Sequence, residues 1–327
     1  MSFPSDDELM AGPNALEPEL IAADDYPADF RAGFACMVGR PNAGKSTLTN
    51  ALVGQKVAIT SGRPQTTRHT VRGIVHREDG QLVLVDTPGL HRPRTLLGQR
   101  LNDLVRETLS EVDVIVFCLP ADEKIGPGDK FIARELSQQR TPVIAVATKA
   151  DKVSREALAA HLLDIQQLGE WAEIVPVSAV RGEQVELLTD LLMARMPLSP
   201  PLYPQGELTD EPENVMIAEL VREAALEGVR DELPHSLAVV VEEIIERPRE
   251  KGDQRPPMLN VHVNIYVERD SQKAIVIGKG GSRLRDVGTR ARHGIEALLG
   301  AKVYLDLHVR VAKDWQRDPK LLQRLGF

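Results

Sequence analysis

Residues 39–46 read G-R-P-N-A-G-K-S, a complete match to the pattern G-x-x-x-x-G-K-[ST]. The apolar run Phe34–Val38 precedes this stretch, and the helical run Thr47–Leu52 follows it. Glycines in such a loop let backbone N–H groups turn inward around phosphate oxygens at the N-terminus of a helix. A glycine-rich turn with an incidental lysine is the alternative, but the flanking strand and helix favour a phosphate-binding loop.

Two side chains of this loop and one downstream motif predict how phosphates and a metal are held. Lys45 is expected to reach the β- and γ-phosphates, and the Ser46 hydroxyl is expected to bind Mg²⁺. The third apolar run ends in D-T-P-G, residues 86–89, whose Asp suits a magnesium-associated carboxylate and whose Gly N–H suits a γ-phosphate. D-T-P-G alone is a common turn, so its position downstream of the phosphate loop carries the interpretation.

The order of predicted elements places the loop in an α/β domain. Short apolar runs alternate with amphipathic helices over residues 30–196, which predicts a mostly parallel, six-stranded sheet covered on both faces. Residues 197–212 contain five prolines and are interpreted as a linker. The expected strands are Phe34–Val38, Val71–His76, Leu82–Val85, Val114–Leu119, Val143–Ala147 and Ile174–Val177.

A second domain of α+β type is expected over residues 213–327. A helix, two strands and a short helix lead to the loop G-K-G-G at 278–281, which a long helix and a last strand follow. Residues 260–327 carry 13 Lys or Arg and 7 Asp or Glu, a net charge of +6. The whole chain has a net charge of −8, so the remainder, 1–259, carries −14. One basic module in an acidic protein indicates a local site for a polyanion.

The remaining features of the composition indicate the cellular compartment. Residues 1–29 carry eight acidic side chains and no basic one, and we expect a disordered acidic tail there. The N-terminus lacks the basic start of a secretion signal, and no apolar run approaches the roughly 20 residues that span a bilayer. Cys36 and Cys118 lie in apolar runs without histidine neighbours. A reduced cytoplasmic compartment and no transmembrane segment are therefore expected.

Further motifs resemble those that read guanine. Together with the loop at 39–46 and D-T-P-G, the stretches T-K-A-D at 148–151 and S-A at 178–179 are similar to the guanine-nucleotide motifs of translation-factor-class GTPases. In that family the third motif is N-K-x-D, whose Asp accepts hydrogen bonds from guanine N1–H and the 2-amino group. In this sequence Asp151 occupies the position of that Asp, and Thr148 replaces the usual Asn. The resemblance implies GTP and GDP as ligands.

Two segments closely resemble the switches of the bacterial Era GTPases: P-Q-T-T-R-H at 64–69 and D-T-P-G-L-H-R-P at 86–93. The resemblance implies that Thr67 contacts Mg²⁺ and the γ-phosphate, and the alternative is an inert basic surface loop. Leu90 stands where many GTPases carry a water-positioning glutamine, so slow intrinsic hydrolysis is expected. Asn42 resembles the asparagine that holds potassium in several related bacterial GTPases, which implies a K⁺ ion near Asn42.

The element order of residues 213–327 resembles that of the prokaryotic-type (type II) KH domain, in which a G-x-x-G loop clamps single-stranded nucleotides. Lys279 and the arginines after the loop add charge that phosphate neutralises. An ordinary interhelical turn and a solvated basic helix face are the alternatives. The candidate RNA contacts are Gly278, Lys279, Gly280, Gly281, Arg283 and Arg285.

Residues 30–327 resemble the Era family from end to end. The resemblance implies a GTPase that binds the 3′ end of small-subunit (16S) ribosomal RNA and acts in 30S subunit assembly. It also implies a cytoplasmic monomer with peripheral association with the inner face of the cell membrane. Two alternatives stay open: a signalling GTPase whose KH-like domain contacts protein or membrane, and an ATP-dependent kinase.

These motifs define the expected nucleotide site. Lys45, Thr67 and Asn42 are the candidate catalytic residues, and Ser46, Thr67 and Asp86 are the candidate magnesium ligands. The expected nucleotide contacts are Gly39, Arg40, Pro41, Asn42, Ala43, Gly44, Lys45, Ser46, Asp86, Thr87, Pro88, Gly89, Leu90, Thr148, Lys149, Ala150, Asp151, Ser178 and Ala179.

Overall fold

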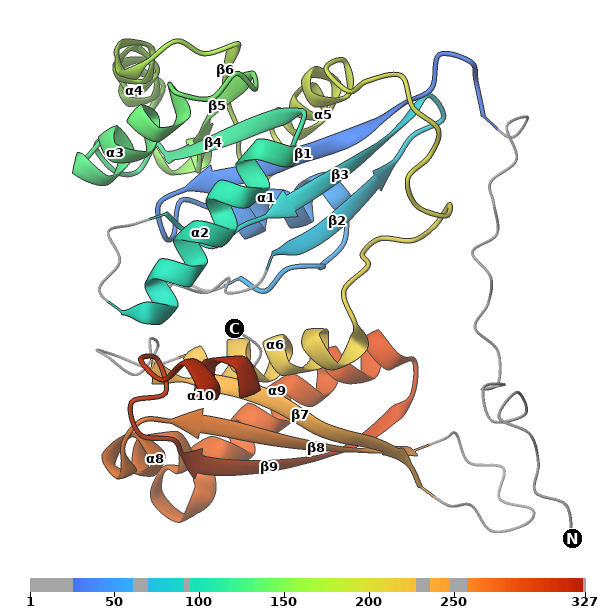
Figure 1. The fold of residues 1–327 in the computed structure, drawn as a ribbon, viewed down its shortest axis with the longest axis vertical. Helices are drawn as coiled ribbons and strands as arrows, with labels where there is room; N and C mark the ends of the chain where they lie inside the picture. The colour runs from blue at the N-terminus through green and yellow to red at the C-terminus, as the bar shows by residue number, and fades with distance from the viewer. Residues whose placement is uncertain (1–25, 61–69, 91–94, 228–235, 248–257, 326–327) are drawn as a thin grey trace, which may run out of the picture.

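The structure, a computed structural model, describes residues 26–60, 70–90, 95–227, 236–247 and 258–325. Two units follow one another along the chain, each with its own sheet (Figure 1). Most of the expected acidic tail at 1–29 lies outside the described residues. So does the expected first switch at 64–69, with Thr67, and the end of the second switch after Leu90.

The first unit contains a six-stranded sheet in the order β2-β3-β1-β4-β5-β6. All neighbouring strands are parallel except β2, which runs antiparallel to β3, so the predicted mostly parallel sheet is confirmed. β1 begins earlier than predicted because residues 31–33 pair with residues 80–82. The strands are β1 Arg31–Gly39, β2 Val71–His76, β3 Gly80–Asp86, β4 Val114–Pro120, β5 Val143–Thr148 and β6 Glu173–Pro176.

Helices cover both faces of this sheet. The helices are α1 Lys45–Val53, α2 Leu96–Glu111, α3 Pro127–Leu136, α4 Arg155–Leu168 and α5 Val185–Met193. Ala35 and Met37 of β1 face the core beneath α1 and α5, whereas Cys36 and Val38 face the core beneath α2, α3 and α4. Burial on both faces explains the near-continuous apolar runs of the central strands. Both cysteines are free and buried, and burial raises the pKa of each thiol. Thiols in this state pack as apolar core residues.

The second unit has the arrangement of a type II KH domain, as predicted. Its elements are α6 Glu213–Leu226, β7 Ala238–Glu246, β8 Met258–Val267, α8 Asp270–Ile277, α9 Ser282–Leu299, β9 Lys302–Val311 and α10 Pro319–Arg324. β8 pairs antiparallel with β7 and parallel with β9. Alternate residues of β8 are buried in a core shared with α6 and α9, in agreement with the period-2 pattern of its sequence.

The proline-rich stretch 197–212 contains no helix or strand, but it is bound along the edge of the first sheet. The side-chain oxygen of Gln81, a residue that is 1% exposed, accepts hydrogen bonds from the backbone N–H groups of Leu202 and Tyr203 at 2.7 and 2.9 Å. Further along, the Leu208 carbonyl accepts from the backbone of β2 at 2.9 Å. The Asp210 carboxylate also pairs with Arg72 of β2 at 2.8 Å, so the stretch is held against the first unit almost as far as α6.

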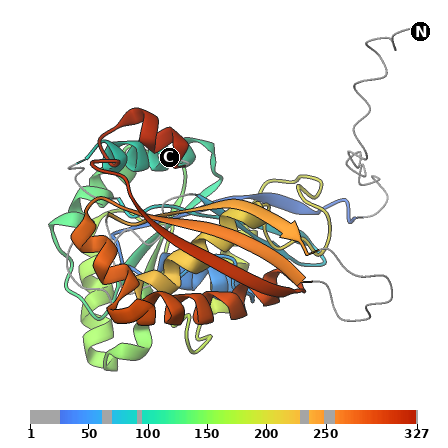
Figure 2. The same ribbon diagram turned by 90° about the horizontal axis from the view of Figure 1, so that it is seen from below.

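Hydrogen bonds join the two units at two of the contacts between them. At the first, the Glu223 carboxylate of α6 accepts from the Thr60 backbone N–H at 2.9 Å and pairs with Lys56 at 2.5 Å. At the second, α10 lies beside the N-terminal end of α2 (Figure 2), where the Leu97 N–H donates to the Gln316 carbonyl at 3.2 Å. Thr60 lies four residues before the expected first switch at 64–69, and α2 begins three residues after the expected second switch at 86–93.

Candidate functional site

The predicted phosphate loop joins β1 to α1. Gly44 has φ 91° and caps α1 in the left-handed region, so the helix N-terminus opens directly onto the loop. A Cβ on Gly44 would also lie 3.5 Å from the Thr148 side chain. Asn42 likewise has a positive φ of 64°, which asparagine tolerates better than most residues. The loop therefore presents backbone N–H groups at a helix N-terminus, as phosphate binding requires.

Lys45 lies inside the curve of this loop. Its side-chain nitrogen is 3.2 Å from the Arg40 carbonyl and 3.5 Å from the Gly39 carbonyl. The residue is 6% exposed, and this burial lowers the pKa of Lys45, whereas the negative charge of Asp86 raises it. The two carbonyls hold the ammonium group beside the loop's N–H groups, and its contact with the phosphates stays a prediction.

Ser46 and Asp86 are brought together as the magnesium prediction requires. The Ser46 hydroxyl donates to the Asp86 carboxylate at 2.6 Å, so two hard oxygen ligands converge beside the loop. Mg²⁺ prefers such ligands and usually completes its shell with water and substrate phosphates. Within the described residues no group of three or more His, Cys, Asp or Glu could hold a metal by itself.

The D-T-P-G motif packs tightly against the loop. A Cβ on Gly89 would lie 2.7 Å from the Pro41 nitrogen, so only glycine permits this approach. Thr87 is fully buried, and its hydroxyl donates to the Met37 carbonyl at 2.6 Å. The Thr87 side chain therefore fixes the motif to β1 instead of facing the nucleotide. Leu90 is 2% exposed and packs in the sheet core, so its side chain points away from the phosphates.

The predicted guanine loop lies at the ends of β5 and β6. The Ser178 hydroxyl donates to an Asp151 carboxylate oxygen at 2.7 Å, and this hydrogen bond lowers the pKa of Asp151. The Ala150 N–H is bonded to the Val177 carbonyl at 3.2 Å, which ties the two motifs together. An ionised Asp151 held in this position is an acceptor of the kind that guanine's two N–H donors need. Ala179 follows Ser178 and is partly buried.

Thr148 connects the base loop to the phosphate loop. Its hydroxyl donates to the Ala43 carbonyl at 2.6 Å, and the residue is 4% exposed. Although Thr148 replaces the usual asparagine, its side chain still forms a hydrogen bond to the phosphate loop.

Replacing Thr148 by valine should weaken nucleotide binding. Thr148→Val keeps the shape of the side chain but removes the hydroxyl that donates the buried hydrogen bond to Ala43. A lost buried hydrogen bond costs about 1–3 kcal/mol, so we expect roughly a tenfold rise in the Kd for GDP. Thr148→Ser is the matched control and should bind GDP nearly as tightly as the unmodified protein. Isothermal titration calorimetry measures the Kd for GDP of all three proteins. Equal affinities of Thr148→Val and Thr148→Ser would show that the hydroxyl does not contribute to nucleotide binding.

The G-K-G-G loop joins α8 to α9 with three glycines at positive φ, Gly278, Gly280 and Gly281. Cβ atoms on Gly280 and Gly281 would meet nothing within 4 Å, so the loop is open to solvent on that side. Lys279 is exposed at its tip. An open backbone next to a cation is what close approach of a phosphate chain requires.

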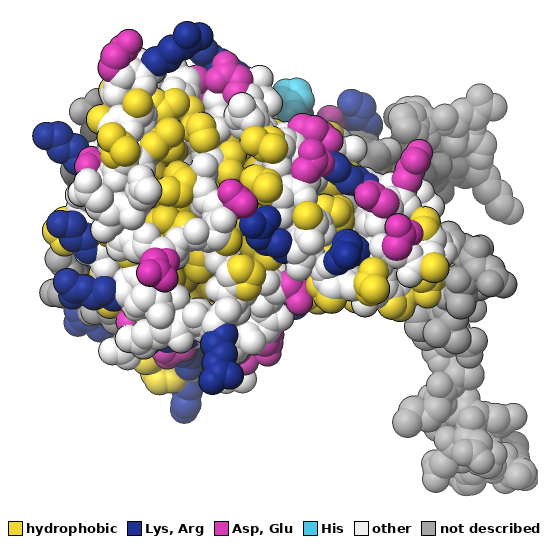
Figure 3. All heavy atoms as spheres, turned by 90° about the horizontal axis from the view of Figure 1, so that it is seen from above, with side chains coloured by type: hydrophobic (Ala, Val, Ile, Leu, Met, Phe, Trp, Pro, Cys, Tyr) yellow, Lys and Arg dark blue, Asp and Glu magenta, His cyan; other side chains and the backbone are white. Residues whose placement is uncertain are grey.

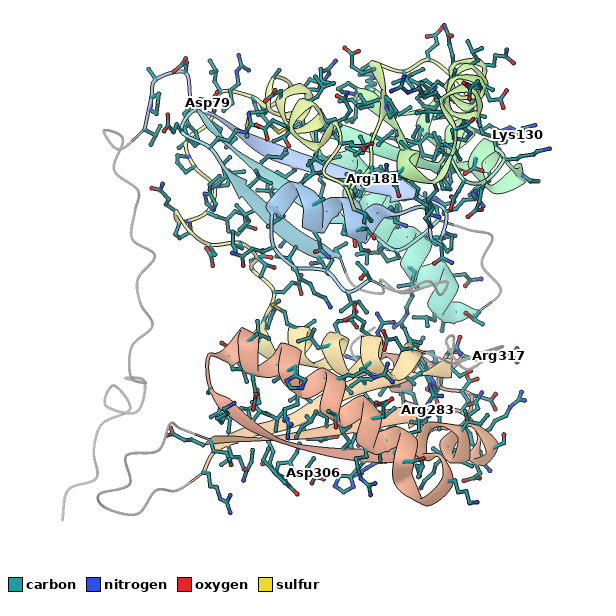
Figure 4. All side chains as sticks on the ribbon, turned by 180° about the vertical axis from the view of Figure 1, so that it is seen from behind. Asp79, Lys130, Arg181, Arg283, Asp306 and Arg317 are labelled. Atoms are coloured by element: carbon teal, nitrogen blue, oxygen red, sulfur yellow. The ribbon has the colours of Figure 1, made fainter. Side chains whose placement is uncertain are left out.

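The arginines after the loop divide into two groups. Arg283 faces α6 (Figure 4), and its guanidinium donates to the Ala225 and Glu227 carbonyls at 3.2 and 2.9 Å. Arg290 pairs with Asp286 and Glu227. The predicted contact Arg283 therefore ties the loop to the end of α6. Its guanidinium is turned away from the loop's open side.

Arg285 and Arg292 belong to the second group and line a groove between α9 and β9 that begins at Gly281. Spacings of four, three and four residues place Gly281, Arg285, Gly288 and Arg292 on one face of α9. Tyr304 of β9, 58% exposed, forms the opposite wall. The sequence analysis did not include Tyr304 among the candidate RNA contacts. It could have been found as an aromatic residue at an outward-facing position of the last strand.

This groove contrasts with the far end of the molecule. Seen from above, the face of the first unit opposite the KH domain has basic and acidic side chains intermixed around apolar ones (Figure 3). The glycine loop, two arginines and an exposed aromatic of the second unit form a more suitable site for single-stranded nucleic acid.

The fold and these sites define a guanine-nucleotide P-loop GTPase with a C-terminal KH domain. Residues 34–149 match the family model described as 50S ribosome-binding GTPase, and residues 232–316 match the KH domain model. GTPase Era of Streptomyces coelicolor is 69% identical over 93% of this chain and 98% of its own length. GTPase Era of Mycolicibacterium smegmatis is 66% identical over 91% of this chain and 99% of its own.

Solved structures agree with these relatives. A crystal structure of Era in complex with MgGDPNP and nucleotides 1506–1542 of 16S ribosomal RNA is 37% identical, with a TM-score of 0.85 over 91% of this chain and 99% of that one. A variant of Aquifex aeolicus Era bound to GDP and AlF₄⁻ is 36% identical, also with a TM-score of 0.85. The chain belongs to the Era family of GTPases and hydrolyses GTP.

Proposed function

We propose that this GTPase binds the single-stranded 3′ end of 16S ribosomal RNA through its KH domain and acts in assembly of the 30S subunit. The observation that carries the proposal is the open G-K-G-G loop leading into a groove lined by Arg285, Arg292 and Tyr304. Glycine loops admit the phosphate backbone, arginines neutralise it, and an exposed aromatic ring gives a base a surface for stacking. The complex of the 37%-identical Era with nucleotides 1506–1542 of 16S RNA supports this choice of partner.

On the nucleotide side, GTP or GDP is bound with Mg²⁺. Ser46 and Asp86 would hold the metal, which would neutralise charge on the phosphates, and Thr67 is the proposed third contact. Lys45 stabilises the negative charge that develops on the transferred phosphoryl group. Because Leu90 packs in the core, its side chain cannot orient water, and slow intrinsic hydrolysis stays the expected result.

A potassium ion near Asn42 is the proposed source of additional charge neutralisation. We expect faster hydrolysis in KCl than in NaCl at equal ionic strength, and loss of this difference in Asn42→Ala. Because alanine is strained at φ 64°, Asn42→Gly, which adopts that conformation freely, is the matched variant. Steady-state phosphate release measures all three. Equal rates in the two salts for the unmodified protein, or potassium stimulation that survives in Asn42→Gly, would contradict a role for the Asn42 side chain.

The contacts between the two units suggest how nucleotide state affects RNA binding. Glu223 of the KH domain bonds to Thr60 and Lys56 on the stretch that leads towards the first switch, and the C-terminal segment bonds to the first turn of α2, which follows the second switch. A change in either switch would alter one of these contacts and so bias the position of the KH domain.

Crosslinking in cells followed by sequencing of the attached RNA tests the proposal. Enrichment of the 3′ end of 16S RNA supports it. Absence of that enrichment, with crosslinks to protein or lipid instead, would favour the rival signalling GTPase, whose KH-like domain contacts protein or membrane. Within the described residues no helix is long and apolar enough to cross a membrane. Cytoplasmic location, peripheral association with the membrane and a monomeric state stay predictions.

A further inference from the structure

One acidic segment contacts both nucleotide-binding loops. It runs from the end of β4 into the first turn of α3 and carries Asp122, Glu123 and Asp129, which together are called the acidic clamp. Among the described residues three cations lie against the clamp: Arg40 from the phosphate loop, Lys149 from the guanine loop, and Lys152 just after the guanine loop. Neither loop is near this segment in the sequence.

Arg40 is held by the buried member of the clamp. Its Nε donates to the Asp129 carboxylate at 2.7 Å, and a second guanidinium nitrogen lies 3.1 Å from Glu123. Asp129 is 1% exposed, and its other oxygen accepts from the Gly126 N–H at 2.8 Å, which caps α3. A carboxylate fixed by its own helix is a rigid anchor. The Arg40 side chain is 24% exposed whereas Asp129 is buried, so removing Arg40 would leave a buried carboxylate without its partner charge.

Holding the Arg40 side chain also holds its backbone. The Arg40 carbonyl accepts from the Lys45 ammonium at 3.2 Å and from the Ala43 N–H at 3.2 Å. The anchored residue is therefore the one whose carbonyl orients the phosphate-binding lysine and turns the loop. The Arg40 guanidinium points to α3, and this argues for a role in positioning the loop.

Lys149 is anchored by the same segment. Its ammonium nitrogen lies 3.1 Å from an Asp122 oxygen, and its backbone adopts the left-handed conformation with φ 57°. Such a conformation costs free energy in a residue other than glycine, so it persists only where its surroundings hold it. The Ala121 N–H, next to Asp122, also donates to the Thr148 carbonyl at 2.8 Å.

We propose that the acidic clamp positions the phosphate loop and the guanine loop relative to each other, and that Asp129 and Asp122 are positioning residues for guanine nucleotide. Because both loops contact the nucleotide in the ground state and in the transition state, the clamp acts on affinity. Loss of the clamp therefore raises KM and speeds nucleotide release but leaves kcat nearly unchanged.

The test measures release of a fluorescent GDP analogue from the full chain by stopped flow, together with kcat and KM for GTP. Asp129→Asn removes the charge and keeps the shape, and we expect release about tenfold faster, with kcat changed less than about twofold. Glu135→Gln is the matched control, because Glu135 lies on the same helix and pairs with Arg106 at 3.2 Å, away from the nucleotide loops. It should behave as the unmodified protein.

A double-mutant cycle separates positioning from direct contact with phosphate. If Arg40 acts through Asp129, then Arg40→Ala combined with Asp129→Asn releases nucleotide no faster than Arg40→Ala alone. Additive effects would mean that Arg40 binds phosphate directly and would overturn the proposal. Asp122→Asn changes a more exposed member of the clamp, so it keeps the test valid even if Asp129→Asn fails to fold. Release from Asp122→Asn as slow as from Glu135→Gln would also overturn the proposal.

Discussion

Gly280→Asp is expected to lose ten- to hundredfold in affinity for the 3′ end of 16S RNA while GTP hydrolysis stays at the unmodified rate. The change places a carboxylate where a phosphate must approach, and loss of one good phosphate contact costs roughly 1–3 kcal/mol. The structure makes the variant tolerable, because a Cβ at Gly280 meets nothing within 4 Å and aspartate accepts left-handed backbone better than most residues. Fluorescence anisotropy of labelled RNA and phosphate release measure the two activities.

Gly300→Asp is the matched control for this variant. Gly300 has φ 59°, close to the 60° of Gly280, also has open space around its Cβ, and lies at the other end of α9. The two variants therefore share the added charge and the backbone strain but differ in their distance from the loop. Equal RNA affinity of the two folded variants, as judged by circular dichroism, would show that the G-K-G-G loop is not the binding face.

Asp151→Asn is expected to exchange guanine for xanthine specificity. The carboxylate accepts two hydrogen bonds from guanine, and an amide can accept one while turning a donor towards the guanine 2-amino group. Hydrogen bonds to charged groups contribute about 1.5–3 kcal/mol each, so we expect roughly a hundredfold loss of GTP affinity. Xanthine nucleotides, which carry a carbonyl in place of the 2-amino group, should bind this variant more tightly than GTP.

Competition between GTP, ATP and xanthosine triphosphate for the fluorescent GDP analogue measures the change. The fold should survive, because the amide oxygen of the new side chain can still accept from the Ser178 hydroxyl, as the Asp151 carboxylate does at 2.7 Å. Asp164→Asn, at an exposed position of α4, is the control and should keep the preference for GTP. Equal affinity of the unmodified protein for ATP and GTP would contradict the role of Asp151 in recognising guanine.

Local patterns in the sequence were sufficient for the sheet and for the phosphate and guanine loops. The strand before the phosphate loop, the D-T-P-G turn and the alternation along β8 all depend on residues close together in the chain. Strand ends were less well predicted because pairing with a neighbour sets them, as for the start of β1.

The partners of individual side chains could not be predicted in this way. Arg283 and Arg285 are two residues apart on a basic helix, yet one bonds to carbonyls of α6, more than 50 residues away, and the other lines the groove. The hydrogen bond from Thr148 to Ala43 spans 105 positions, and the Arg40–Asp129 pair spans 89. Contacts like these depend on how the elements pack, and periodicity does not contain that information.

The most direct test of the account is the affinity of the full chain for a short RNA copied from the 3′ end of its own 16S RNA, compared with a scrambled RNA of the same length. Both are titrated by fluorescence anisotropy at two salt concentrations with a non-hydrolysable GTP analogue present. We predict at least about tenfold tighter binding of the native sequence, with affinity for both RNAs falling as salt rises. Equal binding of the two RNAs at both salt concentrations would contradict recognition of the ribosomal 3′ end.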